Sequence, residues 1–276
     1  MIKKIFFHTI LRLNKIFFKF FNKSQKEYLV SSLGYSNNNS LTLDIDNNEL
    51  FNSIIKKFDN KILRKENYGN LVSLFTTFEC INYIVKKNLL GDIIESGVAN
   101  GRQVCLILET LKYYNKKNFN VYLYDTFQGM VEPGKYDYKT WEKDNSESIK
   151  KYNKSLNENK VSSWQNYSLE EVKKNISLTE YPENKINYVI GDVTLTIPNN
   201  KHETISFLRL DTDFYESTKV ELDYLFSKVI KGGVIILDDY GAFTGVKKAT
   251  DEFFDSHNLS PLLIRTSFKE RVFIKL

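Results

Sequence analysis

Paired carboxylates follow two short apolar runs in the second half of the chain. Asp211 and Asp213 end the first run, and Asp238 and Asp239 end the second. Each run has the length of a buried parallel strand, and open α/β sheets bind ligands beyond the carboxyl ends of such strands. Four acids at one site repel one another unless a cation lies between them, and oxygen ligands of this kind favour Mg²⁺ or Ca²⁺ over zinc. The alternative is that a pair only caps the following helix, because Asp is a common N-cap residue.

A glycine-containing segment upstream has the features of a cofactor loop. An apolar run ends in Glu95 and Ser96, and Gly97 and Gly101 follow before a helical pattern that extends to Leu111. Glycine allows the backbone to turn sharply and to approach a ligand at a helix N-terminus. The spacing E-x-G-x-x-x-G differs from the dinucleotide fingerprint G-x-G-x-x-G. The segment therefore predicts a loop that binds a cofactor without defining which one.

Two further apolar runs also end in acids. The run VYLYD ends in Asp125 beside Thr126, at a distance from Gly101 where an acid can bind the hydroxyls of a nucleoside ribose. The run KINYVIGD ends in Asp192. These signals alone indicate only a nucleotide-like ligand, because any doubly wound protein can end its strands in Gly and Asp.

The ordered series of segments is more specific than any single motif. It reads ESGVANG, YLYDTFQGMVEP, SLEEVKKNISLTEYPENKINYVIGDV, LRLDTDFYEST and GGVIILDDYG, with KKATDEFF following. From about Tyr68 to about Phe254 the chain resembles the macrocin O-methyltransferase family, whose members use S-adenosylmethionine and Mg²⁺ to methylate sugar hydroxyls in bacterial natural products. The resemblance implies a class I methyltransferase fold. That fold is a Rossmann-like α/β sheet of seven mostly parallel strands, with helices on both faces and a C-terminal antiparallel hairpin.

The resemblance also implies roles for individual residues. Cofactor binding falls to the loop and to the ends of the next two strands, with Asp125 on the ribose and Asp192 facing the adenine. The full predicted cofactor set is Glu95, Ser96, Gly97, Gly101, Asp125, Thr126 and Asp192. The predicted metal ligands are Asp211, Asp238 and Asp239, and Asp213 joins Asp211 as a catalytic residue that accepts the hydroxyl proton.

The chain departs from the family pattern at two places. Thr212 stands between the two acids where the family usually has Gly, and Val246-Lys247 stands where the family usually has Cys-Arg. The first change bears on the turn that directs Asp213.

The chain divides into three predicted regions. Residues 1–26 form a basic amphipathic helix, residues 27–67 a linker and helical extension, and residues 68–276 the methyltransferase domain with a lid insertion at about 130–167. We predict parallel strands at 92–95, 121–125, 187–190, 205–211 and 234–238, and a hairpin of 261–266 with 271–275. The lid aromatics either stack on a sugar ring or pack the lid onto the body of the enzyme; they are Tyr136, Tyr138, Trp141 and Trp164.

Composition excludes several classes of protein. The chain has 276 residues, a net charge of +5 and two cysteines, Cys80 and Cys105, which fit a cytoplasmic enzyme without a disulfide framework. The basic residues form no cluster with aromatics near the acidic motifs, so we do not expect nucleic-acid binding. The three histidines lie outside every motif, which disfavours a histidine general base.

The first 26 residues contain no acid, and their basic residues recur every three or four positions. A helix would bring these residues onto one stripe beside a surface rich in Phe, Ile and Leu. Such a helix suits the surface of an anionic membrane, here the inner face. Packing of the apolar side against the enzyme or a second subunit is the alternative. The basic stripe comprises Lys4, His8, Arg12, Lys15, Lys19 and Lys23.

These observations predict an S-adenosylmethionine- and Mg²⁺-dependent O-methyltransferase that acts on a hydroxyl of a sugar, glycan or glycosylated natural product. The alternative is a non-catalytic cofactor- or glycan-binding protein on the same fold. A nicotinamide enzyme would need a hydride-transfer site, for which we find no motif. The acceptor, the hydroxyl that is methylated and the formation of a homo-oligomer are left open by the sequence.

Overall fold

The computed structural model describes residues 43–63 and 68–276, so the predicted basic helix at 1–26 lies outside the described residues. The chain separates into two compact units between Asn52 and Ser53. In the first unit, α3 (Leu43–Asp46) is followed by α4 (Glu49–Lys56), which continues into the second. The Asn48 side chain accepts a hydrogen bond from the Phe51 backbone N–H at 2.9 Å, which caps the start of α4.

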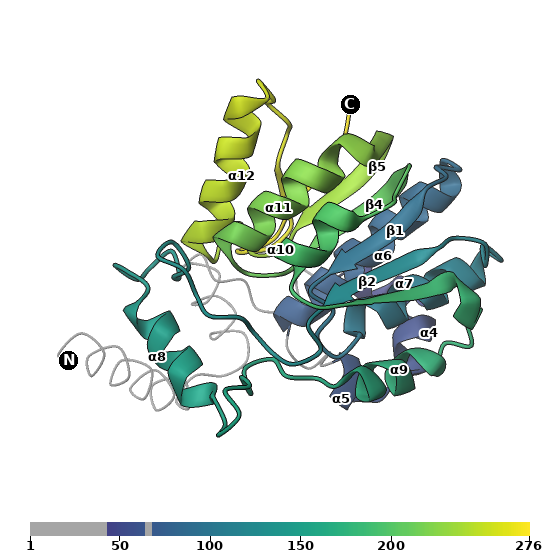
Figure 1. Cartoon of the computed structure of the whole chain (residues 1–276). Helices are drawn as coiled ribbons and strands as arrows, with labels where there is room; N and C mark the ends of the chain where they lie inside the picture. The colour runs from purple at the N-terminus through teal and green to yellow at the C-terminus, as the bar shows by residue number, and fades with distance from the viewer. Residues whose placement is uncertain (1–42, 64–67) are drawn as a thin grey trace, which may run out of the picture. The chain divides into compact units, whose positions relative to one another are not determined.

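The second unit contains a sheet of seven strands in the order β3-β2-β1-β4-β5-β7-β6 (Figure 1). The first five strands are parallel, and β7 pairs antiparallel with both β5 and β6. This topology confirms the predicted mixed sheet with a C-terminal antiparallel hairpin. The strands are β1 (Asp92–Ser96), β2 (Val121–Asp125), β3 (Ile186–Ile190), β4 (Ile205–Leu210), β5 (Val229–Leu237), β6 (Ile264–Arg265) and β7 (Arg271–Ile274).

Strand β5 begins five residues before its predicted start at Val234, because the glycine pair Gly232-Gly233 does not end the strand. The Gly232 N–H donates to the Lys275 carbonyl at 2.7 Å, and the Lys275 N–H donates to the Gly233 carbonyl at 2.9 Å. Pairing with the C-terminal segment thus replaces the turn that two adjacent glycines predict. Its register with β4 shifts at this point, which indicates a bulge.

Helices cover both faces of the sheet (Figure 1). One group, which includes α6, α7 and α9, lies on one face, and α10, α11 and α12 lie together on the other. The helices of this unit are α5 (Asn60–Leu63), α6 (Tyr68–Lys86), α7 (Arg102–Tyr113), α8 (Ser146–Ser155), α9 (Leu169–Ser177), α10 (Val193–Thr196), α11 (Tyr215–Leu225) and α12 (Thr244–Ser256). Among the residues that the structure describes, none of the helices combines the length and the apolar character needed to cross a bilayer.

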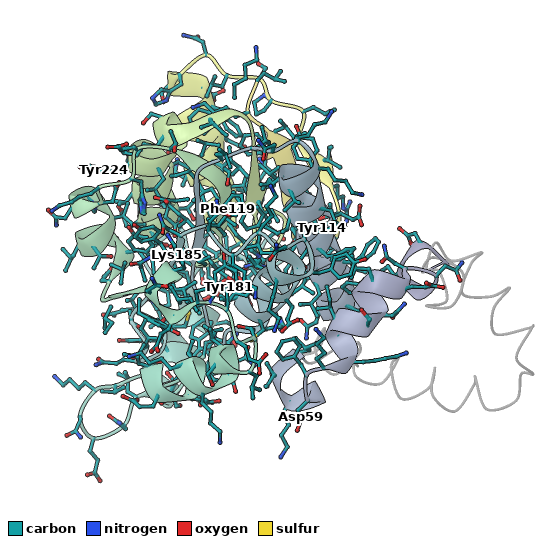
Figure 2. All side chains as sticks on the ribbon, turned by 90° about the vertical axis from the view of Figure 1, so that its right-hand side faces the viewer. Asp59, Tyr114, Phe119, Tyr181, Lys185 and Tyr224 are labelled. Carbon is teal, nitrogen blue, oxygen red and sulfur yellow. The ribbon has the colours of Figure 1, made fainter. Side chains whose placement is uncertain are left out.

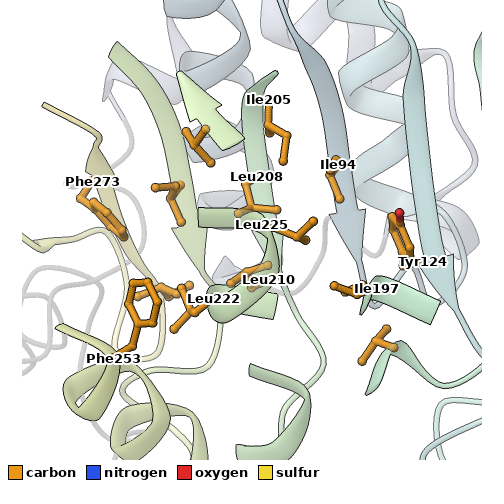
Figure 3. Close-up of a cluster of buried hydrophobic side chains, with 14 of the residues drawn as sticks. Ile94, Tyr124, Ile197, Ile205, Leu208, Leu210, Leu222, Leu225, Phe253 and Phe273 are labelled. Carbon is orange, nitrogen blue, oxygen red and sulfur yellow. The ribbon is translucent and has the colours of Figure 1, made fainter. Parts of the chain in front are cut away.

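A buried cluster fixes β4 and β5 against α11 and α12 (Figure 3). Leu208 and Leu210 of β4 meet Leu222 of α11 and Phe253 of α12 in this cluster, with Phe273 of β7 beside them. All six residues of β4 are buried, as expected for a central parallel strand. Because these strands are held on both sides, the residues that follow them leave the sheet at defined positions.

Tyr181 connects the segments that precede β2 and β3, and it is labelled in Figure 2 together with Phe119 and Lys185. Its hydroxyl contacts the carbonyl oxygens of Lys116 and Phe119 at 3.1 and 3.2 Å, and the Lys185 ammonium donates to the Asn120 side chain at 3.2 Å. These bonds join the segment before β2 to the segment before β3. The chain is therefore packed at the amino ends of β2 and β3. The candidate site lies at the carboxyl ends of the strands.

Candidate active site

A cavity of about 600 Å³ lies at the carboxyl ends of the strands, between the sheet and the lid. It is lined by the glycine loop after β1, by the residues that follow β2 and β3, by the acids after β4 and β5, and by parts of the lid. Its predicted members are Gly97, Asp125, Thr126, Asp192, Asp211, Asp213 and Asp239.

The glycine loop contacts its neighbouring strand as well as the cavity. Gly97 has a φ of 82°, and a Cβ there would lie 2.1 Å from the backbone carbonyl oxygen of Asp211. The missing side chain is therefore required by the backbone after β4, and the approach of a ligand to Gly97 stays a prediction. Gly101 has a φ of 81° and is the N-cap residue of α7.

Asp125 organises the same loop. Its Oδ2 accepts hydrogen bonds from the backbone N–H groups of Val98 and Ala99 at 2.7 and 3.1 Å. Its Oδ1 accepts from the Phe127 N–H at 2.8 Å. Asp192 follows the neighbouring strand β3 and is the N-cap of α10, with Oδ1 accepting from the Thr194 N–H at 2.9 Å. Both acids are thus oriented by the backbone, and their roles toward a nucleoside stay predictions.

Glu95 and Ser96 lie behind the loop, where both are buried and neither lines the cavity. Burial raises the pKa of Glu95 to about 8, although the nearby Arg209 guanidinium acts in the opposite direction. The Glu95 Oε1 lies 3.5 Å from that guanidinium. The structure therefore connects Glu95 to the acidic edge rather than directly to the cavity.

Three acids converge at the end of the cavity. Ligand oxygens of Asp211, Asp213 and Asp239 all lie within 4.8 Å of one another. Loss of hydration raises the pKa of Asp211 to about 8, and it also raises the pKa values of Asp213 and Asp239. The charge of Asp211 adds to the shift at Asp213, and the charge of Asp213 adds to the shift at Asp239. A cluster of carboxylate oxygens that favours protonation also favours a divalent cation, so the donor set fits Mg²⁺.

The Asp238 carboxylate is buried beneath this cluster and contacts two cations. Its Oδ1 accepts from the Arg209 guanidinium and its Oδ2 from the Lys269 ammonium. Burial opposes its ionisation, but Arg209 and Lys269 hold the pKa of Asp238 below its ordinary value. Among the four predicted acids, Asp238 contacts both cations, whereas Asp211 pairs with Arg209 and Asp239 with Lys269. The role of Asp238 as a metal ligand stays a prediction.

Arg209 joins these acids and was not identified from the sequence. Its guanidinium is fully buried in β4, 2.6 Å from Asp211 Oδ2 and in contact with Asp238. Burial disfavours the cation, yet Asp211 and Asp238 raise the pKa of Arg209 well above its ordinary value. The available signal was an arginine inside an apolar strand, because a buried charge requires a partner. Lys269, which approaches from the β6–β7 turn, gives no such signal.

Thr212 holds the turn between the two catalytic acids. Its hydroxyl lies 2.8 Å from Ser217 Oγ and donates to Glu221 Oε1 at 3.0 Å, and both partners belong to α11. Asp213 follows with a φ of 68°, in the left-handed region. A side chain at position 212 is therefore accommodated by hydrogen bonds to the next helix.

The lid is attached to the acidic edge by backbone pairing and by a buried acid. Lys139 forms an antiparallel bridge with Phe243, only a few residues after Asp239. Asp137 accepts from the Tyr215 N–H at the start of α11 and from the Gly134 N–H, both at 2.7 Å. The segment 130–167 thus forms an ordered wall of the site.

The lid aromatics differ in position. Trp164 lines the cavity and also packs edge to face with Phe214 at a centroid distance of 6.1 Å. Tyr136 packs against Tyr215 at 5.0 Å, and Trp141 is 67% exposed. Of the four aromatics proposed to meet a sugar, Trp164 alone lines this cavity.

Comparisons with known proteins identify the family of this chain. The sequence model of the macrocin-O-methyltransferase (TylF) family matches residues 74–270. Demethyldecarbamoylnovobiocin O-methyltransferase of Streptomyces niveus is 28% identical over 186 residues, which cover 67% of this chain and 66% of that protein. Mycinamicin III 3''-O-methyltransferase of Micromonospora griseorubida is 25% identical over 185 residues, which cover 67% of this chain and 68% of that protein. The match therefore spans about two thirds of the length of these relatives.

Solved structures show the same fold. The O-methyltransferase NovP superimposes with a TM-score of 0.64 at 26% identity, covering 74% of this chain and 80% of that chain. A calicheamicin methyltransferase superimposes with a TM-score of 0.58 at 16% identity, covering 86% of this chain and 90% of that chain. The second likeness concerns the fold alone.

Proposed function

This chain belongs to the macrocin O-methyltransferase family, and from this premise we propose that it transfers the methyl group of S-adenosylmethionine to a hydroxyl of a sugar-containing acceptor. One observation carries the proposal. The cavity contains a glycine loop at the N-terminus of α7 and, at its other end, three acids whose oxygens lie within 4.8 Å of one another. Such a cavity can hold a nucleoside cofactor and a polar acceptor side by side.

The cofactor end of the cavity suits S-adenosylmethionine. Asp125 and Thr126 line the cavity. Each oxygen of a carboxylate can accept more than one hydrogen bond, so Asp125 can bind the ribose hydroxyls while it holds the loop. Asp192 also lines the cavity, and in our proposal it faces the adenine. The Arg102 side chain lines the cavity at the first position of α7, where a cation and the helix N-terminus together favour the carboxylate of the methionine moiety.

The acidic end suits a cation and an acceptor hydroxyl. In our proposal Asp211 and Asp239 hold Mg²⁺, and Asp238 completes the set. When bound, the ion supplies orientation of the sugar hydroxyls and a lower pKa for the hydroxyl that reacts. For Asp238 to serve as a ligand, its carboxylate must exchange the Lys269 ammonium for the ion.

The reaction is an in-line displacement whose barrier falls when the two reactants are held in line. The acceptor oxygen forms a bond to the methyl carbon while the carbon–sulfur bond breaks, and the bonding electron pair stays on sulfur. Asp213 accepts the hydroxyl proton. The hydrogen bonds of Thr212 to α11 hold the turn that brings Asp213 to the acidic end of the cavity.

The test combines cofactor binding with methyl transfer. Calorimetry with S-adenosylmethionine and with NAD⁺ identifies the cofactor, and radiolabelled S-adenosylmethionine with a panel of glycosides and sugar phosphates measures transfer. We expect transfer to stop in excess EDTA and to return with Mg²⁺. Cofactor binding without transfer to any acceptor would favour the non-catalytic alternative, and full transfer in EDTA would contradict the role of the ion.

Substitutions then assign the acids. Asp239→Asn and Asp211→Asn should weaken Mg²⁺ binding along with turnover, whereas loss of a proton acceptor in Asp213→Asn should lower turnover and leave Mg²⁺ affinity nearly unchanged. Asp238→Asn reports whether Asp238 contacts the ion. The matched control is Asp223→Asn, because Asp223 lies on the surface of α11 in an ion pair with Lys219 at 2.9 Å.

A further inference from the structure

The lid contributes two lysines to the cavity that the proposed reaction does not use. Lys139 comes from the segment that pairs with Phe243, and Lys151 comes from α8 in the lid (Figure 1). Both line the cavity. They come from separate parts of the lid, so their approach to one cavity results from the fold of the lid.

Each ammonium lies over an aromatic ring. The Lys139 Nζ lies 3.2 Å from the centroid of Phe243, and the Lys151 Nζ lies 3.6 Å from the centroid of Trp164. Phe214 packs between these rings, with its centroid 5.8 Å from that of Phe243 and 6.1 Å from that of Trp164. One aromatic wall therefore carries both cations, and contact with the rings limits where each ammonium can move.

Neither lysine forms an ion pair with a carboxylate of residues 43–63 or 68–276. The neighbouring Lys150 on α8 has Glu147 at 4.0 Å, and Lys247 and Lys248 on α12 have acids one helical turn away. Burial lowers the pKa of Lys151, and the positive charge of Lys139 adds to this effect, while Asp213 acts against it. The Lys151 side chain is exposed, and Asp213 offsets part of the repulsion between the two ammonium groups, so an anionic ligand would stabilise both further.

From this arrangement we propose that the acceptor is a glycosyl phosphate, whose phosphate binds Lys139 and Lys151. The inference rests on the proposed methyl transfer and names the chemical class of its acceptor. The sugar ring lies against the aromatic wall, its hydroxyls meet the acids at Asp213, and its phosphate meets the two ammonium groups. Lysine binds phosphate as a mobile point charge, which suits an ester whose oxygens rotate. The phosphate links the sugar either to a nucleoside or to a lipid carrier.

The test measures phosphate binding directly and does not depend on methyl transfer. The chain has two tryptophans, so Trp141→Phe leaves Trp164 as the only source of tryptophan fluorescence. Trp164 contacts Lys151 and should therefore report binding at that lysine. In this background we titrate inorganic phosphate, glucose 1-phosphate, methyl glucoside and glucuronic acid. We expect a saturable change with the two phosphates, and no change with methyl glucoside at equal concentration.

The variants Lys139→Met and Lys151→Met keep the length of the side chain and remove its charge. Each should weaken phosphate binding on the order of tenfold, because a bond between charged partners is lost. Lys151→Arg should retain binding, and Lys150→Met is the matched control because the Lys150 side chain is 60% exposed and outside the cavity.

Further probes distinguish the two sources of phosphate. Tighter binding of uridine diphosphate than of phosphate would indicate a sugar nucleotide, and tighter binding of farnesyl phosphate would indicate a lipid-linked sugar. The proposal is overturned if inorganic phosphate causes no saturable change, if both methionine variants bind it as the parent does, or if glucuronic acid binds more tightly than glucose 1-phosphate. Calorimetry with S-adenosylmethionine on the same samples separates these outcomes from failure of the proposed function.

Discussion

Arg209 is the residue on which the acidic edge depends, because its guanidinium neutralises carboxylates that would otherwise repel one another. The guanidinium contacts Asp211 and Asp238 directly. The nitrogen that contacts Asp238, Nη2, also lies 3.9 Å from Glu270 Oε2. Glu270 is in turn bonded to the Ser73 hydroxyl at 2.8 Å. The acids after β4 and β5 are thus held from inside the sheet, while their cavity side stays available to a cation.

Replacement of Arg209 with methionine should destabilise the fold. It leaves buried carboxylates without their partner, which typically costs about 3 to 5 kcal/mol in the free energy of unfolding. Urea denaturation followed by circular dichroism measures the change. Arg209→Lys should recover part of the loss because the charge returns without the two-pronged geometry. An unchanged midpoint for Arg209→Met would contradict the structural role given to this residue.

Glu221 predicts how stability depends on pH. It is fully buried, and burial raises its pKa from the ordinary 4.5 to about 8. Between these two values the folded chain keeps a proton that the unfolded chain has released, so its contribution to stability falls as pH rises through this window. Glu221→Gln keeps an acceptor for Thr212 without a titrating group.

In Glu221→Gln, the free energy of unfolding should therefore fall less steeply with pH than in the parent. The slope should change by at most about 1.4 kcal/mol per pH unit. Urea denaturation at several pH values measures it, with the exposed Glu203→Gln as control. A slope as steep as that of the parent would show that Glu221 is ionised in the folded chain.

Among the elements, the position of the lid depends most clearly on a single residue, Asp137. Asp137 bonds the first turn of α11 to the lid segment at Gly134, and α11 begins directly after Asp213 and Phe214. The aromatic wall and the lysines of the lid therefore share an anchor with the acids that end β4. Movement of this anchor would alter the acceptor side of the cavity before the cofactor side.

Asp137→Ala should raise the KM for the acceptor and leave the affinity for S-adenosylmethionine nearly unchanged. It should also cost about 1 kcal/mol of stability through loss of the cap on α11. Steady-state kinetics and calorimetry measure the two quantities separately. Equal losses of acceptor and cofactor affinity would contradict a role confined to the lid.

At the scale of the whole molecule, the methyltransferase sheet belongs to the compact unit Ser53–Leu276, and the basic segment 1–26 precedes it. The segment contains no acid to repel an anionic surface. We continue to propose peripheral binding of this segment to anionic membrane.

Full-length protein should float with liposomes that contain phosphatidylglycerol at low salt, and a chain that begins at Tyr28 should not. Electrostatic attraction to the lipid headgroups is the reason, so added salt should reduce flotation. Phosphatidylcholine liposomes serve as the control. If both chains float equally, the apolar side of the segment is better explained by packing against protein.

Several features of this protein were determined by its sequence alone. The runs that end in Asp125 and at Asp211 form strands because apolar residues of strand length are stable only when buried between helices. Their acids meet because parallel strands carry their carboxyl ends to one edge. Family membership followed from the same ordered motifs, and the family model confirms it.

Other features depend on residues distant in the chain, and only the tertiary structure decided them. Gly97 is required by the carbonyl oxygen of Asp211, and Asp238 is neutralised by Arg209 and Lys269. Long-range contacts of this kind have no local pattern, because a side chain's partner is set by how the strands and the lid pack. Whether an acid pairs with a lysine side chain or stays available to a metal ion is therefore a property of the folded molecule.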